Sequence, residues 1–352
     1  MSSAYADGSP SICNDNENTQ QHIMSSVDLS PCYQAELELA KSAARKAGEI
    51  IRSYSTNNSG RSNNSAVVCV KSGVDLVTEA DTHVERVITS MIKEAFPDDT
   101  IIGEEDQAMK SNGSSTEQQS NLKVPQQYDT FPANTRIWCI DPIDGTTNFV
   151  HNYPFVAVSI GFVTNGVPCV GVVYNPFTDC MYEAATGCGT LLNGNRVTID
   201  TVATSIQDCL LVNNIGHCRD INFINESTDR VNKWLRAGLR GYRSSGSAAQ
   251  NLAHVASGQV SCYYEHGYGG PWDVCAGIVL VQEAGGVVWD ASIAVGQESR
   301  DEEGHDHHGD DDDDDERMDL RMHFGKGSVC AGERKVVEDV LRVAGKPTVT
   351  FS

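Results

Sequence analysis

Long hydrophobic runs are missing from this sequence of 352 residues, and their absence excludes several classes of protein. No segment approaches the ~18 consecutive apolar residues of a membrane-spanning helix, so we expect no membrane partner or anchor. Residues 1–30 are rich in Ser, Asn, Asp and Gln and have no apolar core, so we expect no secretory signal. The polar composition of residues 1–29 predicts a disordered N-terminal segment.

Paired cysteine motifs are missing as well. The twelve cysteines are scattered and never form a C-x-x-C pair. Cys139, Cys169 and Cys275 lie inside apolar segments, where a free thiol is a small core residue. A chain of this size without a secretory signal seldom depends on a disulfide framework. We therefore predict a reducing, cytoplasmic compartment.

Positive charge is scarce: 26 basic residues accompany 48 acidic ones, and the formal net charge is −22. Half of that charge lies between Asp301 and Asp319, where twelve acidic residues accompany one arginine. This balance argues against nucleic acid or an anionic membrane as a partner. It does not exclude a phosphate substrate, because bound cations would reverse the local charge. We interpret residues 297–319 as a disordered insert without a catalytic role, with weak cation binding as the alternative.

Hydrophobic residues make up 39% of the chain, enough for one large domain or two merged halves. Apolar residues at helical spacing predict two amphipathic helices before residue 96, and alternating runs after Val156 predict an antiparallel meander. Strands and helices alternate in the second half. We predict a single domain over residues 30–346, with halves at 30–200 and 201–346 and an exposed polar insert near 107–135.

The most informative stretch reads Trp-Cys-Ile-Asp-Pro-Ile-Asp-Gly-Thr-Thr-Asn-Phe and begins at Trp138. Pro142 cannot donate a backbone hydrogen bond, so we expect strand pairing to stop there. The carboxylates of Asp141 and Asp144 and the carbonyl of Ile143 would then converge on one small volume. Mixed carboxylate and carbonyl oxygens suit Mg²⁺. The alternative is a plain β-turn, since Asp-Pro and Asp-Gly pairs are common turn formers.

Two helix starts are candidate anion sites. Gly145 lets the backbone approach a ligand, and a helical turn beginning at Thr146 would offer N–H groups to phosphate. A second helix is expected after Gly246-Ser247-Ala248, where a plain N-cap is the equal alternative.

Acidic and hydroxyl side chains at other helix starts have a simpler interpretation. Thr78 or Asp81 could cap the second helix. Asp273, at the start of a later helix, would on local sequence alone be a dipole-stabilising cap.

In this order, the motifs resemble the inositol monophosphatase family of lithium-sensitive, metal-dependent phosphatases. The resemblance extends from about Gln34 to Gly345. The segments that carry it are Lys71 to Asp81, Gly103 to Glu105, Trp138 to Asn148, Pro154 to Phe162, Gly246 to Ala248 and Trp272 to Gly286. It implies a layered αβαβα sandwich, with an α+β half packed on an α/β half, and a homodimer.

The resemblance also implies a site. Mg²⁺ would be held by the carboxylates or backbone carbonyl of Glu105, Asp141, Ile143, Asp144 and Asp273. Glu104 would support these ligands. The nucleophilic water would lie near Glu105 and Thr146, with Thr146 hydrogen-bonded to Asp81, so these three are the implied catalytic residues. The implied substrate contacts come from the same loop and two further segments: Glu105, Ile143, Asp144, Gly145, Thr146, Gly246, Ser247, Ala248, Glu265 and Asp273.

The implied activity is Mg²⁺-dependent hydrolysis of a phosphate monoester by metal-activated water, without a covalent intermediate. Myo-inositol 1-phosphate is the favoured substrate, and histidinol phosphate, a sugar 1-phosphate or a nucleotide bisphosphate are alternatives on the same scaffold. His217 lies where the family usually has a small polar residue, so it either alters substrate choice or faces solvent. A different class of hypothesis is a non-catalytic cation-binding protein that uses the acidic tract.

Overall fold

The computed structural model describes residues 33–58, 68–72, 75–106, 135–216, 218–291 and 327–345. Several predictions fall on other parts of the chain. The N-terminal segment 1–29, nearly all of the insert 107–135, the acidic insert 297–319 and His217 lie outside the described residues.

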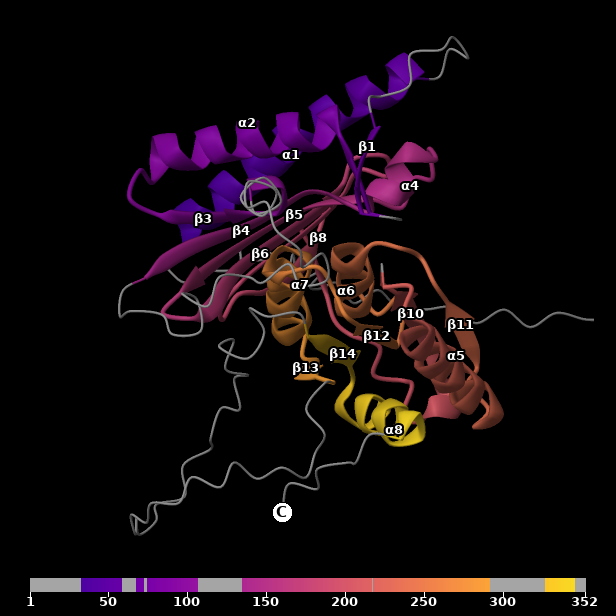
Figure 1. Cartoon of the computed structure of the whole chain (residues 1–352). Helices are drawn as coiled ribbons and strands as arrows, with labels where there is room; N and C mark the ends of the chain where they lie inside the picture. Colours follow the sequence, from indigo (N-terminus) through magenta and orange to yellow (C-terminus); the bar gives the residue numbers. More distant parts are fainter. Residues whose placement is uncertain are drawn as a thin grey trace, which may run out of the picture.

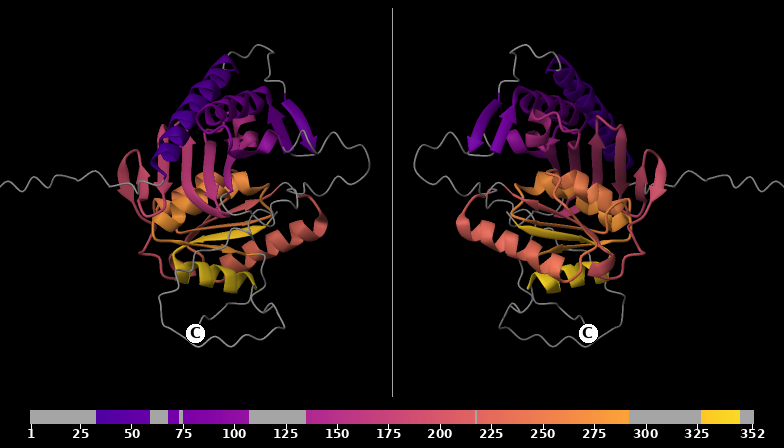
Figure 2. Two further views of the ribbon diagram at one scale, coloured as in Figure 1. Left: turned by 90° about the vertical axis from the view of Figure 1, so that its left-hand side faces the viewer. Right: turned by 90° about the vertical axis from the view of Figure 1, so that its right-hand side faces the viewer.

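Two β-sheets alternate with layers of helices (Figures 1 and 2). Helices α1 (Gln34–Asn58) and α2 (Glu79–Ala95) cover the outer face of the larger sheet. Helices α6 (Ala248–Ala256) and α7 (Pro271–Glu283) lie between the sheets. Helices α5 (Ile221–Arg236) and α8 (Arg334–Ala344) cover the far face of the smaller sheet. The predicted αβαβα sandwich is confirmed.

The larger sheet has seven strands in chain order, and β3 and β4 are its only parallel pair within the described residues. The predicted meander follows β4, and its first hairpin turns at Asn165 and Gly166, whose positive φ angles suit a two-residue turn. The strands are β3 (Thr100–Gly103), β4 (Arg136–Asp144), β5 (Ala157–Thr164), β6 (Val167–Asn175), β7 (Cys180–Ala185), β8 (Gly189–Leu192) and β9 (Asn195–Val197). A separate pair, β1 (Val68–Ser72) and β2 (Asp75–Thr78), precedes them.

The smaller sheet has the order β11-β10-β12-β14-β13. Strand β10 is parallel to both neighbours, so its carboxyl end and that of β12 lie at the same edge. Its strands are β10 (Leu210–Ile215), β11 (Gly241–Arg243), β12 (Cys262–His266), β13 (Val287–Asp290) and β14 (Ser328–Gly332), and a short 3₁₀ turn, η2 (Ile206–Asp208), precedes them. None of the helices in the described segments is both long and apolar enough to cross a membrane.

Helix α7 packs unusually close to the larger sheet because glycines face it. A Cβ atom on Gly171 of β6 would lie 2.2 Å from the carbonyl oxygen of Ala276. A Cβ atom on Gly161 of β5 would lie 2.4 Å from the sulfur of Cys275. The helix is buried on nearly all sides, as expected of a helix between two sheets.

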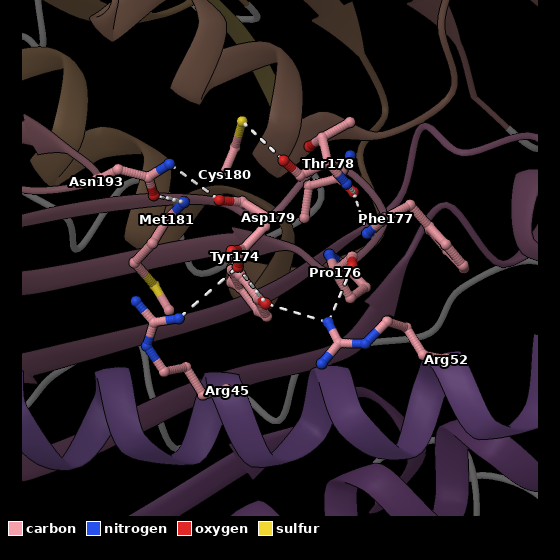
Figure 3. Close-up of polar contacts among 11 residues, drawn as sticks. Arg45, Arg52, Tyr174, Pro176, Phe177, Thr178, Asp179, Cys180, Met181 and Asn193 are labelled. Carbon is pink, nitrogen blue, oxygen red and sulfur yellow. Dashed lines mark hydrogen bonds and ion pairs between the residues drawn. The ribbon is translucent and has the colours of Figure 1, made fainter.

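Helix α1 is attached to the turn between β6 and β7 by a polar network (Figure 3). The Arg52 guanidinium donates to the Tyr174 hydroxyl at 3.2 Å and to the Pro176 carbonyl at 2.9 Å. The Tyr174 hydroxyl donates to Asp179 at 2.8 Å, and Arg45 lies over the Tyr174 ring. The first helical layer is therefore held to the sheet by directional contacts as well as by apolar packing.

His254 of α6 gives the fold a pH-dependent stability. Its ring lies edge-on to Phe155 and near Tyr182, and burial lowers its pKa to about 4. The unfolded chain therefore binds more protons than the folded chain between pH 6.5 and 4. The stabilisation is complete above pH 6.5 and is lost as the pH falls.

We expect His254→Gln to remove this dependence. From pH 7 to pH 5, the parent chain should lose about 2 kcal/mol more of its unfolding free energy than the variant. Urea denaturation at the two pH values measures this difference. His151→Gln, at an exposed position, is the control and should keep the parental slope. An unchanged slope in His254→Gln would show that this histidine is not held neutral.

Candidate active site

Three carboxylates converge where β4 ends. Asp141 and Asp144 of β4 and Asp273 of α7 each offer one oxygen, and these oxygens all lie within 4.8 Å of one another. The prediction that strand pairing stops at Pro142 is wrong, because β4 continues to Asp144 and its register against β5 shifts between the two aspartates. Residues three apart on a regular strand point to opposite faces, so this irregularity brings both carboxylates to one cluster.

The carboxylate of Asp144 lies on the N-terminus of α6. It accepts hydrogen bonds from the Ser247 hydroxyl at 2.5 Å, the Ala248 amide at 3.1 Å and the Ala249 amide at 2.7 Å. The anion site predicted at this helix start therefore exists, but the anion in it belongs to the protein itself. Ser247 also caps the helix, since its hydroxyl accepts from Gln250 at 3.3 Å.

Asp273 caps the start of α7, as its local sequence suggests, and its carboxylate also belongs to the acidic cluster. It lies at the third position of α7 and accepts hydrogen bonds from the backbone amides of Gly269 and Gly270, at 2.5 and 3.3 Å. These bonds cap the helix start. They also fix the carboxylate, whose other oxygen is left available to the cluster.

The three aspartates are electrostatically unfavourable together. Burial, and then the charges of Glu104 and of one another, raise the pKa of Asp141 well above its ordinary value. Burial and its acidic neighbours likewise raise the pKa of Asp273 well above normal. Burial raises the pKa of Asp144 to about 6, although its three hydrogen bonds act in the opposite direction. A dense set of buried carboxylate oxygens fits a hard divalent cation, which would offset this repulsion.

Glu105, the fourth predicted acidic ligand, and its neighbour Glu104 both lie outside the three residues whose oxygens are within 4.8 Å of one another. In the described structure Glu105 is buried and its backbone amide donates to Glu85 at 2.8 Å. The adjacent Glu104 is the glutamate whose charge raises the pKa of all three aspartates.

Thr146 lies between the cluster and Asp81. Its hydroxyl is 3.3 Å from Oδ1 of Asp81 and 3.2 Å from the Ile143 carbonyl oxygen, so its single hydrogen has two alternative acceptors. The hydrogen bond to Asp81 is the one that the resemblance implies. Asp81 also accepts from the Thr78 amide at 2.9 Å, so it completes the cap of α2 at the same time.

The helix start predicted after Gly145 is present. Helix α4 (Thr146–Val150) begins there, and Gly145 has a φ of 95°, in the region that favours glycine. A Cβ atom on Gly145 would lie 3.1 Å from the carbonyl oxygen of Gly246. Glycine at this position therefore lets the two loops meet beside the cluster.

Glu265 of β12 is the remaining predicted contact. Its carboxylate is buried, and burial raises its pKa to about 7, with a contribution from the charge of Asp144. Asn214 donates to its Oε2 atom at 3.1 Å, and the Tyr263 hydroxyl donates to the same oxygen. Sequence reasoning did not single out Asn214, which lies in a strand that reads as ordinary core.

Glu85 of α2 anchors the segment that carries Glu104. Its two carboxylate oxygens accept from the backbone amides of Glu105 at 2.8 Å and Asp106 at 2.9 Å. A Cβ atom on Gly103 would lie 2.4 Å from the Glu85 carboxyl carbon, so glycine is needed for this close approach. Glu85 is buried, and burial raises its pKa to about 7.

We expect Glu85→Ala to weaken cation binding more than catalysis. Without its anchor the Glu104 segment would sample more conformations, and the Mg²⁺ concentration for half-maximal activity should rise about tenfold. The turnover number at saturating Mg²⁺ should change less than about threefold. Magnesium titrations of phosphatase activity measure both quantities. Glu94→Ala, at an exposed position of the same helix, is the control; an equal effect there would remove the anchoring role.

A layered αβαβα fold with acidic side chains clustered beside a helix start is typical of metal-dependent phosphatases. The chain belongs to the inositol monophosphatase family, whose model matches residues 33–307. An inositol monophosphatase of Mesembryanthemum crystallinum is 39% identical over 258 residues, which cover 73% of this chain and 85% of that protein. Human inositol monophosphatase 1 is 36% identical over 260 residues, covering 74% and 85%. An inositol monophosphatase structure from Anabaena (Nostoc) sp. PCC 7120 aligns with a TM-score of 0.61 at 28% identity, covering 90% and 97%.

Proposed function

We propose that this chain is a Mg²⁺-dependent phosphatase that hydrolyses myo-inositol 1-phosphate to inositol and inorganic phosphate. The observation that carries the proposal is the convergence of Asp141, Asp144 and Asp273 within 4.8 Å. The helix start at Gly145 and Thr146 lies next to this cluster in the chain. The names of the matched relatives support inositol phosphate as the substrate.

We propose Glu105, the three aspartates and the Ile143 carbonyl as the Mg²⁺ ligands. Glu104 would support them, since its charge reaches all three aspartates. When bound, divalent cations neutralise the charge of a phosphate ester and lower the pKa of water near it.

The residues beside the cluster then have distinct tasks. The amides of Gly145 and Thr146, at the start of α4, would hold the phosphate oxygens. Of its two alternative acceptors, the Thr146 hydroxyl would donate to Asp81, which leaves its lone pairs to accept a hydrogen bond from the attacking water. This arrangement orients the water and gives its proton a route toward a buried carboxylate. Glu265 would accept hydrogen bonds from ring hydroxyls of the substrate.

A substrate panel tests the proposal. Phosphate release from myo-inositol 1-phosphate, histidinol phosphate, galactose 1-phosphate and a nucleotide bisphosphate is measured with and without Mg²⁺. We expect Mg²⁺-dependent release that is fastest with the inositol ester and inhibited by lithium. Faster turnover of histidinol phosphate would overturn the substrate assignment. Mg²⁺ binding that disappears when residues 301–316 are deleted, with Asp144→Asn harmless, would favour the non-catalytic alternative.

We further propose that the enzyme acts in the cytoplasm as a homodimer built from one catalytic domain per chain. The dimer rests on the family resemblance. The compartment is supported by the cysteines, because those with described side chains are all free thiols. Light scattering coupled to size exclusion measures the mass in solution, and a monomeric mass would overturn the dimer.

A further inference from the structure

Asn214 is bonded to two sides of the candidate site through the two ends of one amide group. Its Oδ1 atom accepts from the backbone amides of Gly246 at 3.0 Å and Ser245 at 3.3 Å. Its Nδ2 atom donates to Oε2 of Glu265 at 3.1 Å. The partners fix the orientation of the amide, because backbone N–H groups require an acceptor and a carboxylate requires a donor.

The sheet explains why Asn214 and Glu265 meet. Strands β10 and β12 are parallel, and the two residues are directly paired in register. Their side chains therefore leave the sheet on the same face, close to the edge where both strands end. The side chain of the preceding residue, Asn213, leaves the sheet on the opposite face, where its amide donates a hydrogen bond to the Tyr242 hydroxyl at 3.1 Å.

Glu265 has one oxygen bound and one available. Both donors to it among the described residues, Asn214 and Tyr263, arrive at Oε2. Its Oε1 atom has no donor in the described part of the chain, and it is not one of the buried side-chain atoms that lack a partner there, so it is the oxygen that remains accessible. The hydroxyl of a bound substrate could donate to it.

We infer that Asn214 is a specificity-determining positioning residue, which selects hydroxyl-rich leaving groups by holding Glu265 with Oε1 directed to the substrate. The inference rests on the proposed phosphatase function and names the residue that gives it a substrate preference. Asn214 itself does not touch the reacting phosphate. It acts through Glu265 and through the Ser245-Gly246 loop that leads into α6.

Asn214→Asp separates the two ends of the amide. An aspartate can still accept from Ser245 and Gly246, so the loop keeps its support. It can no longer donate to Glu265, and two carboxylates would stand at hydrogen-bond distance and repel each other. Asn214→Leu removes both interactions. If the contact with Glu265 sets the preference, the aspartate variant must lose it while its loop stays in place.

The test compares a hydroxyl-rich ester, myo-inositol 1-phosphate, with phenyl phosphate, which has no hydroxyl on its leaving group. In Asn214→Asp we expect kcat/KM for the inositol ester to fall at least about tenfold, mostly through KM. Activity on phenyl phosphate should stay within about threefold of the parent, which also shows that the variant is folded. Asn214→Leu should show the same split with a larger loss. The matched control, Asn213→Leu, should change both substrates by the same factor.

Three results would overturn the inference. Equal loss on both substrates in Asn214→Asp would mean that the residue only stabilises the fold. Unchanged kinetics in both Asn214 variants would mean that it has no part in substrate choice. A parent enzyme that hydrolyses phenyl phosphate with Mg²⁺ but does not prefer the inositol ester would overturn the preference and leave a phosphatase. A parent chain that is inactive on both esters would instead overturn the proposed phosphatase function, on which the inference rests.

Discussion

Asp144→Asn is expected to abolish phosphate release, lowering kcat/KM by about 10³-fold or more. Asp144 contributes an oxygen to the acidic cluster and accepts three hydrogen bonds from the start of α6. Asparagine has the same shape but no charge. Both oxygens of Asp144 accept from an amide of α6, so in either orientation the NH₂ group of asparagine would face an N–H donor, and the cation would lose a negatively charged ligand.

The measurement is phosphate release at saturating Mg²⁺, combined with thermal unfolding without the cation. We expect the variant to stay folded, because the removal of one buried charge offsets the loss of a hydrogen bond from α6. Asp229→Asn, on the exposed face of α5 and paired only with Lys233 among the described residues, is the control and should keep full activity. Near-parental turnover by Asp144→Asn would mean that this carboxylate is not part of the catalytic machinery.

Gly171→Ala is expected to destabilise the fold by about 3 kcal/mol, the largest effect we expect from one added methyl group. The new Cβ atom would lie 2.2 Å from the Ala276 carbonyl oxygen and 3.0 Å from its carbonyl carbon. These are backbone atoms of a helix enclosed between two sheets, so neither partner can rotate away. The contact can be relieved only by moving α7 from the larger sheet.

Urea denaturation of the two proteins gives the difference in unfolding free energy. The control is Gly187→Ala, at an exposed turn with nothing within 4 Å of the added atom. Its φ of 80° costs an alanine about 1 kcal/mol through backbone strain alone. Should Gly171→Ala prove as stable as the parent chain, α7 must pack further from β6 than described here.

Individual helices and strands could be predicted because periodicity and turn residues are local, whereas the order of layers was implied by the family resemblance. The convergence of Asp141 and Asp144 was expected from a turn at Pro142, and the hydrogen bond between Thr146 and Asp81 from the family resemblance. The continuation of β4 past Pro142 could not be predicted, because it depends on a register shift against β5. The contact of Asn214 with Glu265 could not be predicted from the local sequence either, because the parallel pairing of β10 and β12 creates it.

The segment of Glu104 and Glu105 shows the same dependence on distant partners. The backbone amides of Glu105 and Asp106 are held by Glu85 of helix α2, a contact that the local sequence does not reveal. The anion held at the start of α6 is similar. The helix start is visible in the sequence, but its occupant, Asp144, comes from a strand a hundred positions earlier.

The position of α6 and α7 between the two sheets has a consequence for the integrity of the enzyme. Asp141 and Asp144 come from one half of the chain, whereas Asp273 and the amides that hold Asp144 come from the other. Neither half alone contains all the residues of the proposed active site. Catalysis therefore ends as soon as the seam between the halves opens, while each sheet still keeps its own hydrogen bonds, and loss of turnover is an earlier sign of damage than loss of secondary structure.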